Sequence, residues 1–171
     1  MTASPFVVHV ARLRRSVGSR SREQRSGAIA GLEVTGSSVP EGSQVAVDVV
    51  LESVYGGVEA YGTVEAPWQG PCRRCLAIAT GRLVVPVREL YTESGDGDET
   101  YPLVNDTIDL EVLAHDAVLL ELPPAPLCRQ DCLGLCSMCG VDLNTESCNC
   151  RPVADSRFAV LDVLKGGDQA E

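Results

Sequence analysis

The sequence predicts an α+β fold in which strands dominate, built as an antiparallel sheet or a partly open barrel with two helices. Only 4% of the residues are aromatic, and the frequent valines and leucines favour a core of aliphatic and β-branched side chains. Residues 45–52 also alternate between a more apolar and a more polar set, with the period of two that a half-buried strand requires. Apart from these strands, two short segments have apolar residues at helical spacing.

The strands follow one another along the first half of the chain. In residues 45–52, valine and leucine alternate with a more polar set, and Gly56-Gly57 supplies the positive φ angles of a tight hairpin. The last strand of this half contains Pro86, which predicts a bulge or a sheet edge there because proline has no N–H to donate. We therefore expect strands over residues 5–10, 45–52, 58–67 and 77–91.

Helices are expected only in the second half. Asp109 can cap a helix that ends before Pro123-Pro124, with apolar positions Val112, Leu113, Ala117, Leu120 and Leu119. A second short helix is expected over residues 158–165, stopped by Gly166-Gly167. Before the first helix, residues 92–100 are acidic and contain glycine, which predicts an exposed loop.

Charge divides the chain unevenly. Residues 1–27 hold six arginines and one acid, Glu23, whereas the remaining residues hold eight basic and twenty-three acidic side chains. The serines and glycines among the arginines favour a mobile basic arm, which could contact RNA phosphate or fold back on the acidic body. The expected organisation is a basic strand and arm (1–27), a β-rich core with one helix (28–127), and a cysteine-rich segment with a terminal helix (128–171).

The eight cysteines stand in close pairs, and metal binding is the expected reason. No signal peptide or membrane-spanning apolar stretch is recognised, so we expect a cytoplasmic protein without membrane contact, whose thiols stay reduced. A short gap allows both thiolates of a turn to reach one ion, and two such turns make a zinc site. The ligands are therefore expected to be Cys72 and Cys75, Cys128 and Cys132, Cys136 and Cys139, and Cys148 and Cys150.

Four pairs make two sites, and loop closure favours joining neighbours. Cys136/Cys139 then joins Cys148/Cys150 as a C-terminal zinc knuckle, in which Gly140 allows a positive φ. Cys72/Cys75 joins Cys128/Cys132, with Leu76 at the corresponding position. Spacing alone also allows Cys128, Cys132, Cys136 and Cys139 to share one ion. Four thiolates can hold iron–sulfur clusters as well, but the short two-turn pattern fits zinc better.

An enzyme is not expected. A catalytic zinc normally has histidine or carboxylate ligands and an open position, whereas all eight candidate ligands here are thiols. His9 and His115 are expected to be surface or packed residues. Phosphate-binding glycine loops and nucleophile motifs are absent from the sequence.

Several motifs together resemble a known family. They are LRRSVGS (13–19), CRRCL (72–76), CRQDCLGLCSMCGVDLN (128–144), the CNC pair (148–150) and FAVLDVLK (158–165). In this combination the chain resembles the bacterial and plastid YceD-like proteins, called large ribosomal RNA subunit accumulation proteins. Val17 departs from the pattern, because proline often stands there.

The resemblance implies a non-enzymatic bacterial factor that maintains the level of large-subunit ribosomal RNA and supports ribosome assembly. Joined to the zinc prediction, it suggests a β-rich body that presents arginines to ribosomal RNA or a pre-ribosomal particle, through phosphate contacts that are salt-sensitive and largely sequence-blind. Two alternatives remain: an acidic adaptor for a ribosomal protein or an rRNA-processing enzyme, and a zinc–thiolate redox switch. The arginines expected to touch RNA are Arg12, Arg14, Arg15, Arg73 and Arg74.

Overall fold

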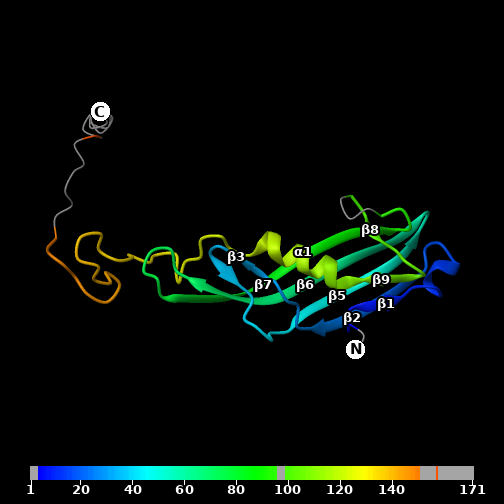
Figure 1. The fold of residues 1–171 in the computed structure, drawn as a ribbon, viewed down its shortest axis with the longest axis horizontal. Helices are drawn as coiled ribbons and strands as arrows, with labels where there is room; N and C mark the ends of the chain where they lie inside the picture. The colour runs from blue at the N-terminus through cyan, green and yellow to red at the C-terminus, as the bar shows by residue number, and fades with distance from the viewer. Residues whose placement is uncertain (1–3, 96–98, 151–156, 158–171) are drawn as a thin grey trace, which may run out of the picture.

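A computed structural model describes residues 4–95, 99–150 and 157, and an antiparallel sheet forms its body (Figure 1). Residues on one face of this sheet enclose the core together with one helix and a pair of short strands. The fold is β-dominant and open, as the sequence predicts. The sheet contains β2 (Arg20–Gly27), β5 (Val45–Val54), β6 (Gly57–Pro71) and β7 (Ile78–Thr92), with the short strands β3 (Glu33–Val34), β4 (Ser37–Ser38) and β8 (Tyr101–Pro102) at its margins.

Burial along β5 alternates from residue to residue, as the alternation of apolar and polar residues predicted. Its odd-numbered residues lie in the core, at 0–1% exposure from Val45 to Leu51, while the even-numbered residues between them are partly exposed. β5 continues into β6 through Tyr55 and Gly56, and Gly56 has a φ of +86°. Gly57 was expected in this turn, but it is the first residue of β6 and pairs with Val54.

The β6–β7 hairpin is the longest feature of the molecule. Each strand has 15 residues, so the hairpin is roughly 45 Å long at about 3.3 Å per residue. Beyond Tyr91 and Thr92, which pair with β8, the outer side of β7 pairs with no other described strand. Pro86 therefore lies on an edge strand, as expected. At the far end of the hairpin, the loop between Pro71 and Ile78 contains the first cysteine pair.

The α-helix α1 (Leu110–Glu121) begins where the sequence predicts it. The Asp109 carboxylate accepts a hydrogen bond of 2.9 Å from the Glu111 N–H, which satisfies one of the free donors of the first turn. The expected apolar face was partly wrong, because Val112 is 46% and Leu120 is 85% exposed. The buried side chains are those of Leu110, Leu113, Ala114 and Val118.

Two short strands complete the layer on the helix side. β1 (Val7–His9) pairs antiparallel with β9 (Thr107–Asp109), and β9 leads directly into α1. Phe6, just before β1, is completely buried in the core. The expected strand at residues 5–10 is thus present, although shorter.

The expected mobile arm is instead a strand of the sheet. After a short 3-10 helix (Leu13–Arg15), residues 20–27 form β2, which pairs along its whole length with β5. Arg20 and Arg22 each make two hydrogen bonds to a carboxylate of the neighbouring strand, Glu52 and Asp48. Arg22 and Gln24 lower the pKa of Asp48 to about 2. The arginines of this strand therefore neutralise the acidic body of the protein itself.

The second expected helix, at residues 158–165, lies outside the described residues, and α1 is the one α-helix of the described part. Thr92, the first residue of the expected acidic loop (92–100), is the last residue of β7, and the other described residues of that loop lie between β7 and β8. Among the helices of the described chain, none has the length and apolar character needed to cross a membrane.

Candidate metal centres

The first cysteine pair lies in the loop at the far end of the β6–β7 hairpin. The Cys72 N–H donates to the Ala77 carbonyl (2.8 Å), and the Leu76 N–H donates to the Cys72 carbonyl (2.9 Å). Leu76 has a φ of +63°, a left-handed conformation that is costly for a residue with a side chain. The turn thus has the shape expected of a knuckle even though leucine occupies the position that favours glycine.

The chain after α1 brings the second pair to this loop. The Arg73 N–H donates to the Pro126 carbonyl (2.9 Å), which holds the incoming chain against the hairpin loop. The Arg74 guanidinium donates to the Cys132 carbonyl (2.7 Å) from the same loop. Cys128 and Cys132 therefore meet Cys72 and Cys75 across more than fifty residues of sequence.

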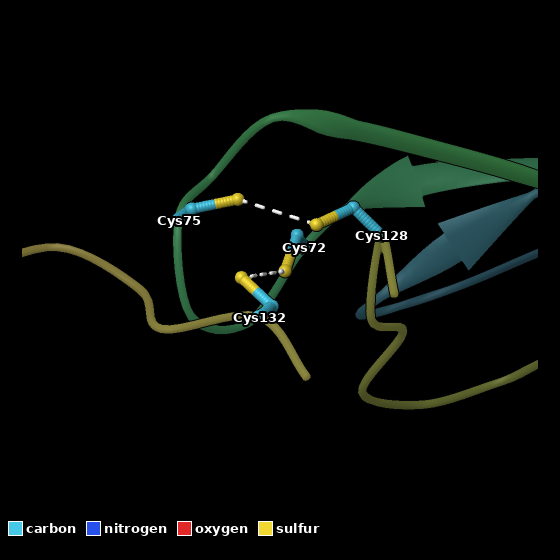
Figure 2. Close-up of side chains that lie close together, drawn as sticks. All are labelled: Cys72, Cys75, Cys128 and Cys132. Atoms are coloured by element: carbon cyan, nitrogen blue, oxygen red, sulfur yellow. Dashed lines mark hydrogen bonds between the residues drawn. The ribbon is translucent and has the colours of Figure 1, made fainter. Parts of the chain in front are cut away.

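The four sulfur atoms form a compact group (Figure 2). Cys72 Sγ lies 3.8 Å from Cys132 Sγ, and Cys75 Sγ lies 3.6 Å from Cys128 Sγ. All four ligand atoms lie within 4.8 Å of one another. Sulfur atoms bound tetrahedrally at about 2.3 Å from one zinc ion would be about 3.8 Å apart, whereas a disulfide bond is about 2.05 Å long. The spacing therefore fits one shared cation and not two disulfides.

This first group is largely enclosed. Cys72, Cys132 and Cys75 are 0%, 2% and 8% exposed, and Cys128 is exposed. Leu127 and Leu135 pack against the three buried cysteines in a small apolar cluster that is separate from the main core. The first site thus provides the packing centre of a segment that the main core does not reach.

The second group repeats the same turn with glycine in the left-handed position. The Cys136 N–H donates to the Val141 carbonyl and the Gly140 N–H to the Cys136 carbonyl, both at 2.8 Å. Gly140 has a φ of +75°. The sulfurs of Cys136, Cys139, Cys148 and Cys150 gather within 4.8 Å of one another. Cys139 and Cys150 are exposed and the other two are half-buried, so this group is much more open to solvent than the first.

Of the pairings that spacing allowed, the structure adopts the one that loop closure favours. Neighbouring pairs share each group, and the alternative that joins Cys128 and Cys132 to Cys136 and Cys139 is not the arrangement found. The short loop between residues 139 and 148 closes the second group, and the β6–β7 hairpin and α1 close the first.

The local electrostatics favour thiolate formation at one cysteine of each group. Backbone N–H groups of Cys128 and Cys75 lower the pKa of Cys72 to about 6, and those of Cys139 and Met138 lower the pKa of Cys136 to about 6. Desolvation raises the pKa of Cys128 to about 12. Neighbouring thiolates repel one another, so without a cation the four thiols of a group do not all lose their protons. A divalent ion at the centre would remove that repulsion.

The donor set fits a closed, structural site for a thiophilic metal. Each group offers four sulfurs, as in the four-cysteine sites that zinc favours, and leaves no coordination position for substrate or water. Neither histidine lies with the cysteines: His9 Nδ1 is 3.1 Å from the Thr107 hydroxyl, and His115 Nδ1 is 3.2 Å from Asp116.

The predicted RNA-binding arginines lie at opposite ends of the molecule. Arg12, Arg14 and Arg15 lie at the β5–β6 turn, where the Gly18 N–H donates to the Ser53 carbonyl (2.7 Å). Arg73 and Arg74 lie at the other end of the long hairpin (Figure 1). The structure therefore does not bring the five arginines together on one surface.

The five arginines also differ in their partners. Arg14 forms ion pairs with Glu93 and Asp106, and Arg74 is hydrogen-bonded to the carbonyls of Gln130 and Cys132. Arg12, Arg15 and Arg73 are exposed, and none makes an ion pair with another residue that the structure describes. Of the five predicted arginines, these three are free to meet a partner.

One residue of the cysteine-rich segment was missed by sequence reasoning. Asn144 lies in the loop of the second group, and its side-chain amide donates to Cys132 Sγ of the first (3.5 Å). An asparagine near a cysteine has no special meaning in one sequence, because its partner is fixed only by the folded loop. Trp68, just ahead of the first pair, packs against the main core and not against the cysteine cluster.

Comparison with known proteins agrees with the motif resemblance. The family model of the large ribosomal RNA subunit accumulation protein YceD matches residues 60–165. An uncharacterized protein of Mycobacterium tuberculosis is 40% identical over 174 residues, covering 96% of this chain and 83% of its own length. An uncharacterized protein of Mycobacterium leprae is 37% identical over 140 residues, covering 72% of this chain and 64% of its own length.

A plant protein extends this similarity over a shorter region. The chloroplastic "large ribosomal RNA subunit accumulation protein YCED homolog 1" of Zea mays is 38% identical over 53 residues, which cover 30% of this chain and 18% of the maize protein. No solved structure matches. Since the family model covers more than half of the chain and a relative at 40% identity spans nearly all of it, the chain belongs to the YceD family.

Proposed function

We propose that this protein is a non-enzymatic, cytoplasmic zinc-binding factor that supports the accumulation of large-subunit ribosomal RNA in a bacterium. Membership of the YceD family and the name of the maize relative support the link to that RNA. The observation that carries the zinc part is the gathering of all eight cysteines into two groups of four sulfurs, each within 4.8 Å of one another.

The metal would stabilise the fold of the cysteine-rich segment. Between residues 128 and 150, the structure shows short hydrogen-bonded turns and one isolated bridge, Leu135 to Asp142, in place of paired strands. So short a segment cannot bury enough apolar surface to fold alone. Two zinc ions held by the eight cysteines would supply that stability and give the tip of the molecule a fixed shape for a partner in ribosome assembly.

Contact with RNA would depend on the few cations that remain unpaired. Arg12 and Arg15 at one end, or Arg73 at the other, are free to reach phosphate. Arg20, Arg22, Arg82 and Arg88 are paired with acids across the strands, so they contribute little to an attractive field. We place the RNA contact at Arg12 and Arg15, where two free cations lie together in the sequence.

Deletion of the gene in its host tests the proposed function. We expect the ratio of large- to small-subunit ribosomal RNA to fall and the wild-type gene to restore it. A gene carrying Cys72→Ser and Cys132→Ser should not restore the ratio, because the metal-bound end cannot form. The ratio is measured on total RNA, with the protein quantified by immunoblot. An unchanged ratio in the deletion strain would refute the role.

An acidic adaptor for a basic ribosomal protein is the second candidate. At least seven arginines of the described residues form ion pairs with carboxylates of the same chain. Four thiolates around a divalent ion also leave a net charge of about −2 at each site. The surface that remains is acidic and suits a basic partner.

Binding assays with purified protein separate the two candidates. If RNA is the direct partner, binding to large-subunit ribosomal RNA should weaken in the Arg12→Glu, Arg15→Glu double variant, and the salt slope should fall by about one for each lost phosphate contact. Arg82→Gln is the control, because Arg82 is already paired with Glu65. Tight binding to a basic ribosomal protein, with RNA binding unaffected by the double variant, would favour the adaptor.

A redox role for the second site is the third candidate. Its exposed cysteines, Cys139 and Cys150, are open to oxidants, whereas the first group is mostly buried. Mild peroxide should then release one zinc ion per chain, from the second site, before the other. Retention of both ions under these conditions would exclude the switch.

A further inference from the structure

Asn144 links the two four-cysteine groups. It belongs to the loop between Cys139 and Cys148, yet its side-chain nitrogen lies 3.5 Å from Cys132 Sγ of the first group. Cys132 is 2% exposed and Asn144 is half-buried, so the sulfur end of this contact is shielded from solvent. One side chain therefore belongs to the loop of one site and contacts a ligand atom of the other.

The hydrogen bonds of Asn144 fix which end of its amide faces the sulfur. Its oxygen accepts from the Leu133 N–H (2.8 Å) and from the Arg129 guanidinium (2.7 Å), and both partners can only donate. The NH₂ group must then point the other way, where it meets Cys132 Sγ and an oxygen of Asp142 (2.6 Å). Thus the amide is the donor and the Cys132 sulfur is the acceptor in this contact.

Cys132 depends on this donor because its own turn provides none. In the two CxxC knuckles, a backbone N–H donates to the first sulfur, from Arg74 to Cys72 (3.4 Å) and from Met138 to Cys136 (3.5 Å). Cys132 closes the longer Cys128–Cys132 gap, and no backbone N–H of the described chain hydrogen-bonds its sulfur. N–H donors to ligand sulfurs orient them and stabilise their charge.

The position of Asn144 is set by the second loop. Asp142 accepts hydrogen bonds from both the backbone and the side chain of Asn144, at 2.9 and 2.6 Å. The Leu143 N–H donates to the Gly134 carbonyl (2.9 Å), which ties this loop to the chain between the two sites. Closing the loop around the second site therefore places the donor that the first site needs.

We propose that Asn144 is a positioning residue that couples the two metal sites, so that filling the second raises the affinity of the first. This inference rests on the zinc binding of the proposed function. Coupling of this kind is reciprocal, so a filled first site also raises the affinity of the second. This coupling favours an order of metal binding, because the solvent-exposed second site positions the Asn144 donor that the enclosed first site needs.

A double-mutant cycle on the full chain tests the coupling. Asn144→Ala removes the donor, and Cys148→Ser with Cys150→Ser removes the second site. We expect each change alone to weaken zinc binding at the first site about tenfold or more, and the combination to weaken it little further, because both remove the same interaction. Affinity is measured by competition with a zinc chelator. If the losses of first-site zinc affinity in the two variants multiply in the combined variant, the inference is overturned.

Cadmium-113 NMR adds a readout that a merely structural role of Asn144 would not move. Cadmium-loaded wild-type protein should give one resonance for each site, and the resonance absent from the Cys148→Ser, Cys150→Ser variant identifies the second. Asn144→Ala should shift the first-site resonance, whereas Glu146→Gln, an exposed change in the same loop, should leave it in place. An unshifted first-site resonance in Asn144→Ala would also overturn the inference. Wild-type protein that binds no metal would instead refute the proposed zinc sites.

Discussion

Removing the metal with a chelator is expected to unfold residues 128–150 while the β5–β6–β7 sheet stays folded. The cysteines of the first site form a cluster of their own with Leu127 and Leu135, and the main core contains none of the eight. A structural zinc ion can add on the order of 10 kcal/mol of apparent binding energy to folding, and that energy would be lost locally. Hydrogen exchange followed by mass spectrometry should show lost protection after Cys128 and retained protection in β5.

The same measurement on a ligand variant serves as the control. Cys132→Ser removes a buried ligand of the first site and should cause loss of protection around that site without any chelator. The untreated wild-type protein should protect the backbone N–H groups of Cys136 and Gly140, which are hydrogen-bonded within the second turn. If hydrogen exchange in residues 128–150 does not change on metal removal, the claim that metal stabilises this segment is contradicted.

Leu113→Ala is expected to destabilise the protein by about 2–5 kcal/mol, because it leaves a cavity between α1 and the sheet. The Leu113 side chain is 1% exposed. Leu120→Ala, in the same helix and with the same chemistry, should change the free energy of unfolding by no more than about 0.5 kcal/mol, since Leu120 is 85% exposed. Urea unfolding followed by circular dichroism measures both.

This pair of variants also tests the orientation of α1. Zinc content should stay the same in both variants. This result would show that the main core and the cysteine-rich segment are stabilised independently. Equal destabilisation by the two changes would mean that the helix packs through a different face. A loss of metal in Leu113→Ala would mean that the two parts fold as one cooperative unit.

Local patterns predicted much of the fold. The alternation in residues 45–52 predicted β5 and its buried face, and Asp109 predicted the start of α1. Chelating spacing and short loops predicted how the cysteines gather. The alternation, the cap and the close spacing of each cysteine pair lie within a few residues, so one sequence is sufficient to detect them, although the first cysteine group then joins pairs more than fifty residues apart.

The features that were missed depend on contacts between distant segments. β2 has little apolar alternation, because its arginines face acids of β5, and this made a strand look like a mobile arm. The two groups of arginines are separated by the length of the β6–β7 hairpin. The sequence alone does not show how far apart the two ends of that hairpin lie. Val112 and Leu120 fit a helical period, but burial depends on the direction from which the sheet approaches α1.

Elemental analysis of freshly purified protein, kept under reducing conditions, tests the central claim most directly. Two zinc ions per chain, with all eight cysteines protected from a thiol-alkylating reagent until the metal is removed, is the result that the two four-sulfur groups predict. Protein that contains no metal and whose eight thiols all react at once would contradict it.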